Sequence, residues 1–411
     1  MTVDLDADAF LKCPFPALAQ ARTGAGVVPA GRPGWFLIAK AGLVREVLRD
    51  TATYSSAVHK HSSPPAGVAD QVAAIRAQGW PYTPGLGTSD PPVHTRQRKL
   101  VNQTFTPRGL AWMEPLVSAA AADLAAALPD GVEIDFVSSF AQPLPVWAIS
   151  EILGLPSERR DDVIRWTRAA TASIGARPAD EDWVPYEEDL LELQHVLADT
   201  LEEQRRNPTD RLISRLAAAA AESEDMSTGL LLTMLRELLV AGNETTAKTI
   251  AQLALLLDGQ TEIWDRVRAT PEYADVVVEE ALRITSPSLS AHRRVTRDTV
   301  LGGVQLPEGS TVVLSLMSAN RDEEVFSDPD RFDPERGSQL RQHLAFGHGV
   351  HICVGAGLAR MELRIAVQAL AERVQSIRVV DPSAATYNES YMLRGLLGLP
   401  VVVTPNERMK R

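Results

Sequence analysis

The sequence has little cysteine, no long apolar run and fewer basic than acidic residues. Its 411 residues include two cysteines, Cys13 and Cys353, which are too far apart to form a disulfide framework, so we expect a reducing compartment. No stretch of about 18 apolar residues occurs, and the acidic start MTVDLDADAF differs from a secretory signal, so we expect no membrane association. The net charge of −12 argues against general nucleic-acid binding. These absences together predict a soluble protein of the cytoplasm.

The remaining pattern predicts a mainly α fold with small β-sheets. Alanine-rich periodic runs such as LVSAAAADLAAAL predict helices over most of the chain from Thr95 to Glu280. Strands are predicted at 34–40, on both sides of the Pro-Glu-Gly turn at 307–309, and at 399–405. The hydrophobic content of 45% suffices for a large core. Because no change of composition marks a linker, we expect a single domain over residues 1–411.

One cysteine lies in an unusual stretch, AFGHGVHICVGAGLARMEL. Cys353 directly precedes a strong helical pattern, and the helix dipole and free backbone N–H groups at a helix start favour the thiolate, which is the form that binds metals. By turn chemistry alone, an inert buried cysteine stays open as an interpretation. A zinc site made by His348, His351 and Cys353 is another, although zinc usually takes four ligands and no second cluster is visible.

The spacing of this stretch resembles a known signature. The pattern F-x-x-G-x-x-x-C-x-G, formed here by Phe346, Gly349, Cys353 and Gly355, is similar to the haem-binding signature of the cytochrome P-450 family. The resemblance implies that Cys353 is the axial ligand of the iron of haem b, and thiolate ligation favours O–O cleavage. It also implies the family fold. The other cofactor-binding residues that it implies in this stretch are Phe346, Gly347, Gly355 and His351, the last as a partner of a haem propionate.

A long apolar helix is predicted from Ser227, a plausible N-cap, through STGLLLTMLRELLVAGNETTAKTIAQLALLLDG. Its centre, AGNETT, places polar groups at core depth, where they need partners or a function. A helix kink satisfied by water is the alternative. The segment resembles the central helix of the same family.

That second resemblance assigns roles to the centre of the helix. Ala241 and Gly242 would open a groove for dioxygen beside the haem. Glu244 would relay protons from solvent, and Thr245 would direct them by hydrogen bonding, since a hydroxyl both donates and accepts. Thr246 is a further catalytic candidate.

Three shorter matches follow in the order of the family. Glu280 and Arg283 resemble its structural E-x-x-R motif, whose partner arginine would be Arg336 or, second, Arg331. The implied propionate partners are His94, Arg98 and Arg293, because arginine and histidine suit a carboxylate. As isolated residues, all of these would be interpreted as ordinary surface charges.

The substrate pocket is predicted from the regions that line it in the family. The residues that these regions offer are mostly apolar, so we expect a hydrophobic organic substrate held mainly by shape. The candidate residues are Trp80, Tyr82, Leu238, Ala241, Leu289, His292 and Leu393. Arg76, Arg177, His292 and Arg394 could anchor an acidic or polar group, but we favour surface roles for them.

The sequence thus predicts a monomeric haem-thiolate monooxygenase that uses O2. It would hydroxylate, dealkylate or epoxidise its substrate in secondary metabolism or catabolism. Its electrons would come from NAD(P)H through a ferredoxin reductase and ferredoxin. Oxidative coupling or rearrangement in the same fold is an alternative, as is a non-catalytic haem sensor, which would not need Glu244 and Thr245.

A local excess of basic residues supports the ferredoxin. No Asp or Glu occurs from Pro91 to Met113, which carries Arg96, Arg98, Lys99 and Arg108, and Arg341 and Arg360 flank the cysteine turn. A basic patch on an acidic protein would steer an acidic partner.

Overall fold

The structure is a computed structural model that describes residues 1–58, 62–221 and 226–406. It divides into two units. Unit 1 contains residues 1–55, 111–145 and 245–411, and unit 2 contains residues 56–110 and 146–244. Each unit is described by itself below. The prediction of a mainly α fold with small sheets is confirmed, whereas that of a single domain stays a prediction.

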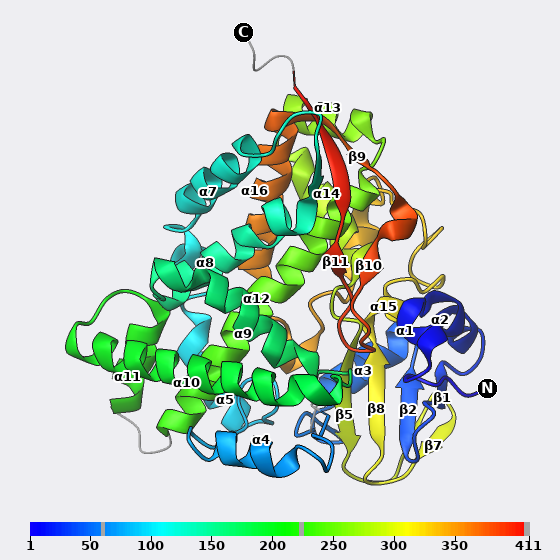
Figure 1. Ribbon diagram of the computed structural model, residues 1–411. Coiled ribbons are helices and arrows are strands. Elements are labelled where there is room, and N and C mark those ends of the chain that lie inside the picture. Colours follow the sequence, from blue (N-terminus) through cyan, green and yellow to red (C-terminus); the bar gives the residue numbers. More distant parts are fainter. Residues whose placement is uncertain (59–61, 222–225, 407–411) are drawn as a thin grey trace. The chain divides into compact units, whose positions relative to one another are not determined.

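A five-stranded sheet forms one end of unit 1 (Figure 1). Its strand order is β1-β2-β8-β5-β3, with β2 and β8 parallel and the other pairs antiparallel. The strands are β1 (Val27–Pro29), β2 (Trp35–Ile38), β3 (Tyr54–Ser55), β5 (Ser290–Val295) and β8 (Thr311–Ser315). The sheet therefore joins the start of the chain to a segment more than halfway along it.

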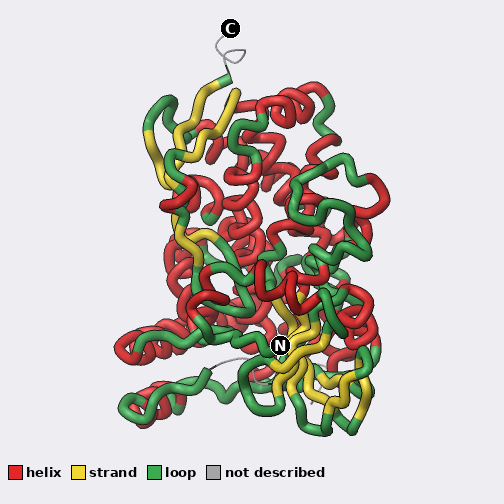
Figure 2. Tube along the Cα trace, turned by 90° about the vertical axis from the view of Figure 1, so that its right-hand side faces the viewer, coloured by secondary structure: helices red, strands yellow, loops and turns green. Residues whose placement is uncertain are grey.

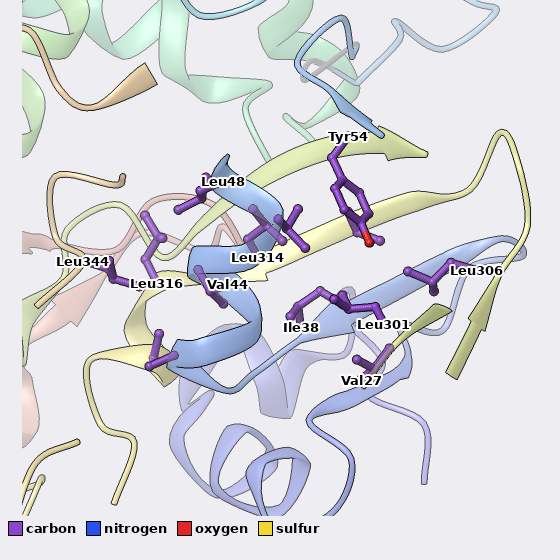
Figure 3. Close-up of a cluster of buried hydrophobic side chains, with 14 of the residues drawn as sticks. Val27, Ile38, Val44, Leu48, Tyr54, Leu301, Leu306, Leu314, Leu316 and Leu344 are labelled. Carbon is purple, nitrogen blue, oxygen red and sulfur yellow. The ribbon is translucent and has the colours of Figure 1, made fainter. Parts of the chain in front are cut away.

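Helix α3 (Ala41–Arg49) packs on this sheet because its apolar residues recur at helical spacing. Ala41, Val44 and Leu48 are buried against strand residues such as Ile38 and Leu314, as Figure 3 shows for the labelled side chains. The same helix contacts the short 3-10 helix η5 (Gly349–His351). The sheet and α3 thus support the segment that carries Cys353.

A second, three-stranded antiparallel sheet, β4-β12-β9, lies near the C-terminal end of unit 1, apart from the first (Figure 2). Its strands are β4 (Glu133–Asp135), β9 (Val374–Val379) and β12 (Pro400–Pro405). Two further pairs are β6 (Thr299–Leu301) with β7 (Val304–Leu306), and β10 (Thr386–Tyr387) with β11 (Leu396–Gly398).

The structure corrects one strand prediction. Besides the Pro-Glu-Gly turn between β7 and β8, the chain turns at Gly302 and Gly303, whose φ angles are 56° and 80°, and β7 pairs there with β6. Because only glycine adopts such angles without strain, the glycine pair was the signal for this hairpin. Strand β4 was not predicted either, since it has three residues.

The remaining elements of unit 1 are mostly helices. Helices α14 and α16 pack together, and α16 also contacts α7 and α13. The helices are α1 (Asp8–Lys12), α2 (Phe15–Arg22), α7 (Glu114–Ala126), α13 (Thr261–Ala269), α14 (Tyr273–Thr285), α15 (Leu316–Ala319) and α16 (Ala356–Arg373), with a π-helix η1 (Val137–Ala141) and 3-10 helices η4 (Gly337–Gln342) and η6 (Pro382–Ala384).

The described part of unit 2 is helical. Helix α10 packs against α4, α9 and α11. The elements are α4 (Ala69–Arg76), α5 (Val93–Asn102), α6 (Pro107–Leu110), η2 (Ser157–Arg159), α9 (Arg160–Ala172), η3 (Asp180–Asp182), α10 (Trp183–Arg206) and α11 (Leu212–Ala221), together with most of α8 (Pro143–Leu153).

Helix α12 (Thr228–Leu256) contributes residues to both units (Figure 1). The Ser227 hydroxyl accepts a hydrogen bond from the Leu230 N–H at 3.2 Å, as expected of an N-cap. The helix continues through Gly242 without a break. Within the described residues, no helix combines the length and the apolar character needed to cross a membrane.

Candidate functional site

The turn that carries Cys353 is closed by a backbone hydrogen bond from the Cys353 N–H to the Phe346 carbonyl, 2.9 Å long. Gly347 and Gly349 have φ angles of 69° and 72°, which other residues adopt only with strain. A Cβ on Gly349 would also collide with the Leu48 carbonyl oxygen of α3. These glycines are therefore required by the shape of the turn.

The Cys353 side chain is exposed and lies three residues before the first residue of α16. The free N–H groups and the dipole at that helix start favour a thiolate. Gly355 places no side chain beside the sulfur. A Cβ at this position would lie 3.9 Å from Cys353 Sγ, which is an ordinary contact distance. The turn thus presents an accessible sulfur close to the start of α16.

Two arginines of α3 bind this turn and the η4 segment before it. Arg49 donates from Nε to His348 Nε2 over 2.8 Å, and Arg45 donates to the Gln342 carbonyl. Burial and both arginines lower the pKa of His348. The described residues contain no group of three or more His, Cys, Asp or Glu side chains placed to hold a metal ion, so the zinc arrangement considered above is not present among them.

Phe346, the first residue of the signature, is fixed by a charged cluster. The Arg360 guanidinium lies 4.4 Å from the centre of the Phe346 ring, and the His343 ring lies 6.0 Å from it. Glu279 accepts hydrogen bonds from His343 Nε2 (2.9 Å) and Arg360 Nε (2.5 Å). Burial alone would raise the pKa of Glu279, but these two partners outweigh it and lower the pKa to about 2. The cluster joins α14 to the turn and to α16.

The centre of α12 combines exposed and buried residues. Ala241 is exposed, Glu244 and Thr245 are partly buried, and Thr246 is buried. Gly242 allows α8 to approach, since a Cβ there would lie 2.7 Å from Ile149 Cδ1. A side chain at this position would force Ile149 to shift, so the glycine serves this packing whether or not it also opens a groove for dioxygen.

Asn243 shows how one polar residue of α12 is satisfied. Its amide donates to the Thr167 hydroxyl (2.9 Å) and to the Leu239 carbonyl (2.8 Å), and the side chain is buried. Asn243 is therefore a structural residue of unit 2.

Glu244 is the last residue of that unit, and Thr245 is the first residue of the next part of unit 1.

The predicted propionate partners belong to different units. His94 is buried on α5, where Arg98 donates to Asn102 over 2.8 Å. Arg293 is buried on β5 and donates to the His292 carbonyl over 2.7 Å. His351 is partly buried in η5. Within unit 1, then, Arg293, His351 and Cys353 are carried by the first sheet and the turn that α3 supports.

Glu280, Arg283 and Arg336 form a buried charge cluster in unit 1. Both Glu280 oxygens accept from Arg283 over 2.7 Å, and Oε1 also accepts from Arg336 Nε over 2.8 Å. Arg331 contributes its backbone carbonyl, which accepts from the other two arginines. Of the two predicted partners, Arg336 therefore supplies the guanidinium. The cluster ties α14 to the loop before η4.

The candidate pocket residues are distributed over both units. In unit 2, the Trp80 N–H bonds to Gln194, the Tyr82 hydroxyl lies 2.8 Å from the Thr88 hydroxyl, and Leu238 is buried. In unit 1, Leu289 lines an apolar cavity of about 10 Å³ together with Leu5 and Phe10 of the N-terminal segment. That volume holds about one water molecule, not a substrate.

His292 and Leu393 also lie in unit 1. The buried His292 ring packs against Trp35 (5.5 Å between centres) and is stacked on Tyr391 (5.6 Å). The Leu393 carbonyl accepts a hydrogen bond from Asn388. These contacts make His292 part of an aromatic cluster and fix the turn of Leu393.

Lys248, three residues after Thr245, was not identified as important from the sequence. It is buried, and its ammonium donates to Asn388 Oδ1 over 3.3 Å. Its stem passes so close to Gly395 that a Cβ there would lie 2.6 Å from Lys248 Cβ. Asn388 also accepts from the Gly395 N–H (2.8 Å). A lysine within an apolar helical pattern was the signal that this residue is buried. Its partner could not be predicted, because Asn388 lies 140 residues away in the sequence.

The chain is similar to known proteins along most of its length. The sequence pattern described as Cytochrome P450 matches residues 186–375. The chain is 38% identical over 326 residues to Cytochrome P450 107B1 of Saccharopolyspora erythraea, covering 78% of each chain. It is 36% identical over 409 residues to Vitamin D(3) 25-hydroxylase of Pseudonocardia autotrophica, covering 98% of this chain and 96% of that one.

A solved structure agrees with this likeness. Cytochrome P450 CREJ in complex with (4-ethylphenyl) dihydrogen phosphate has a TM-score of 0.89 and 28% identity, and the alignment covers 98% of both chains. The residues present fit a haem: Cys353 offers an exposed soft donor of the kind that iron takes in thiolate-ligated haem, and Gly347, Gly349 and Gly355 add no side chains to the turn. The chain belongs to the cytochrome P450 family, and it is an oxidoreductase of the monooxygenase type with haem b as its cofactor.

Proposed function

We propose that this P450 hydroxylates, dealkylates or epoxidises a hydrophobic organic molecule in secondary metabolism or catabolism, and that ferredoxin supplies its electrons from NAD(P)H. The observation that carries the proposal is the acid–alcohol pair Glu244–Thr245 on the same continuous helix as the exposed Ala241. A haem carrier or sensor would not need such a pair. We propose further that the two units work as one catalytic domain, since α12 contributes to both.

The haem, when bound, supplies an iron centre that activates dioxygen. Cys353 would supply the sulfur that binds the iron, and the thiolate charge would be favoured by the start of α16. His94, Arg98, Arg293 and His351 would hold its two carboxylates, because arginine and histidine donate well to carboxylate oxygens. Phe346, Gly347 and Gly355 would shape the turn that carries Cys353 so that the cofactor can approach the sulfur closely.

Glu244 and Thr245 would manage protons. Both residues are partly buried on α12, so each keeps some contact with solvent. A carboxylate can take a proton from water and pass it on, and a hydroxyl can accept one hydrogen bond while donating another. Thr246, buried next to them, would act as a supporting hydroxyl. The pair would thus pass protons one at a time from solvent into the site.

The proposed substrate is apolar over most of its surface. Trp80, Tyr82, Leu238 and Ala241 in unit 2, and Leu289, His292 and Leu393 in unit 1, remain the proposed pocket residues. The Pseudonocardia relative is named for hydroxylation of vitamin D(3), a large apolar molecule, which supports a substrate of this kind. His292 would act indirectly, through its packing with Tyr391.

Electron delivery would use a basic surface of unit 2. Arg96, Lys99 and Arg108 are exposed on α5 and α6, in a stretch without acidic residues. Arg360 is a weaker contributor because its charge is already paired with Glu279. An acidic ferredoxin would be steered by the exposed charges, and salt would screen them beyond about 10 Å at 0.1 M.

The proposal is tested by turnover with a reconstituted ferredoxin system. NADPH and O2 consumption should be accompanied by an oxygenated product, and reduction by ferredoxin should slow as ionic strength rises. Lys99→Glu or Arg108→Glu should weaken ferredoxin-driven turnover without changing haem content. Salt-independent reduction that neither reversal affects would refute the docking surface, and haem binding without any product would refute the monooxygenase function.

A further inference from the structure

The apolar first half of α12 is interrupted by two charged residues, Arg236 and Glu237, both partly buried. They lie in unit 2, as do the residues that surround them. Their flanking residues Leu235, Leu238 and Leu239 are buried, so this is not an exposed polar face of the helix. Buried charges usually have partners, and the partners of these two differ.

Glu237 is bound by the loop that precedes α5. Its Oε2 accepts a hydrogen bond from the Gly87 N–H over 3.4 Å, and Gly85 lies so close that a Cβ there would be 2.9 Å from the Glu237 carboxyl carbon. Neighbouring residues of a helix do not face each other. Glu237 therefore forms no direct ion pair with Arg236, although its nearby charge favours the charged form of that guanidinium.

Arg236 has an aromatic neighbour and no carboxylate partner. Its guanidinium carbon lies 5.7 Å from the centre of the Tyr82 ring, which is a cation–π distance. Within the described ranges 1–58, 62–221 and 226–406, no carboxylate lies within ion-pair distance of it. Burial lowers the pKa of Arg236 despite the nearby Glu237 and Glu187. The five N–H donors of this guanidinium thus lack an anion to receive them.

The other nearby carboxylate is already used. Glu187 of α10 accepts two hydrogen bonds from Arg76 of α4, one of them from Nε over 3.0 Å. The Tyr82 hydroxyl is likewise engaged, by Thr88. A partly buried arginine surrounded by groups with other partners is the arrangement expected around an anion that comes from outside the chain.

We propose that Arg236 binds an acidic group, a carboxylate, of the otherwise apolar substrate, beside Tyr82. The inference rests on the proposed function and names its substrate class as amphipathic organic acids. Arg236 precedes Ala241 by five residues, which is about 7.5 Å along the helix axis. An acid held there would keep an apolar chain of several carbons within reach of the middle of α12.

The arginines that the sequence suggested for this role have other partners. Arg76 is paired with Glu187, and Arg394 in unit 1 stacks on Tyr387 at 3.9 Å and donates to the Leu11 carbonyl. Arg177 is exposed. Arg236 was missed because, in the sequence, an Arg-Glu pair within a helix resembles an ordinary solvated turn.

The test measures binding of saturated fatty acids of eight to sixteen carbons and of their matched primary amides to the haem-loaded protein. Calorimetry and the spin-state shift of the ferric haem give two independent readouts. In the unsubstituted protein, the best acid should bind about 10- to 100-fold more tightly than its amide, because a hydrogen-bonded charge pair discriminates by that factor. Arg236→Met should abolish this preference and leave amide affinity unchanged.

Two further variants make the test decisive. Arg236→Lys keeps the charge without the planar fork and should retain part of the preference, so it serves if the Met variant fails to fold. Arg177→Met removes an exposed arginine of the same unit, and this variant should retain the full preference for the acid over its amide. No preference for any acid, or a preference that survives Arg236→Met, would overturn the inference. A protein that binds no haem would instead refute the proposed function.

Discussion

Replacing Glu280 by glutamine should destabilise unit 1 strongly. The carboxylate neutralises two guanidinium groups, of Arg283 and Arg336, and the three side chains are 0%, 0% and 2% exposed. It also accepts the Asp333 N–H over 2.9 Å. Removing one member of a buried charge cluster leaves the others uncompensated, which costs about 3–5 kcal/mol. Glutamine keeps the shape, so the loss would come from charge rather than from a cavity.

The assay is thermal unfolding followed by far-UV circular dichroism. In domains of comparable size 1 kcal/mol corresponds to about 2–4 °C, so Glu280→Gln should lower Tm by about 6 to 20 °C. Arg336→Met should have a smaller effect, since Glu280 keeps Arg283. The control is Glu324→Gln, which removes an ion pair between Lys40 and a carboxylate that is 69% exposed. A Tm change no larger than that of the control would refute the reasoning.

Three further predictions concern other residues. Thr245→Ala should uncouple the enzyme, with hydrogen peroxide released while NADPH is consumed, and Glu244→Gln should slow oxygen consumption; unchanged rates and coupling in both variants would contradict the proton-delivery role. Gly395→Ala should lower Tm, because the added methyl would meet the stem of Lys248 as far as its Cβ, and pairing it with Lys248→Ala should restore only the part of the loss that comes from Cγ and Cδ. The pKa of Glu279 lies at about 2, below its usual 4.5, so its contribution, on the order of 3 kcal/mol, is present above pH 4.5 and lost as pH falls toward 2. Unfolding measured from pH 6 to pH 3 should therefore be less pH-dependent in Glu279→Gln, and an identical pH profile would contradict this.

Features carried by short runs of sequence could be predicted. The Cys353 turn depends on glycines at fixed positions, so its pattern is visible without the fold. The Ser227 cap of α12 and the amphipathic stripe of α3 are equally local. The Arg336 partner of Glu280 was predicted by family order rather than by chemistry, because 56 residues separate the two.

Features that depend on tertiary contacts could not be predicted. Nothing local distinguishes Arg236, which lacks a carboxylate partner among the described residues, from Arg76, which has one. The same holds for Lys248, whose partner Asn388 is supplied by a distant turn. His292 was placed in the pocket from its position in the chain, whereas its ring packs in a cluster with Trp35 and Tyr391. Such differences are set by which segments the fold brings together.

The most direct test of the central claim is the spectrum of the reduced carbonyl complex. If Cys353 ligates the haem iron, the purified protein should bind one haem per chain and show the red-shifted Soret band of thiolate ligation. Cys353→Ala should lose that band, whereas Cys13→Ala, which removes the other exposed cysteine, should keep it. A red-shifted band that persists in Cys353→Ala, or a protein that binds zinc and no haem, would contradict the account.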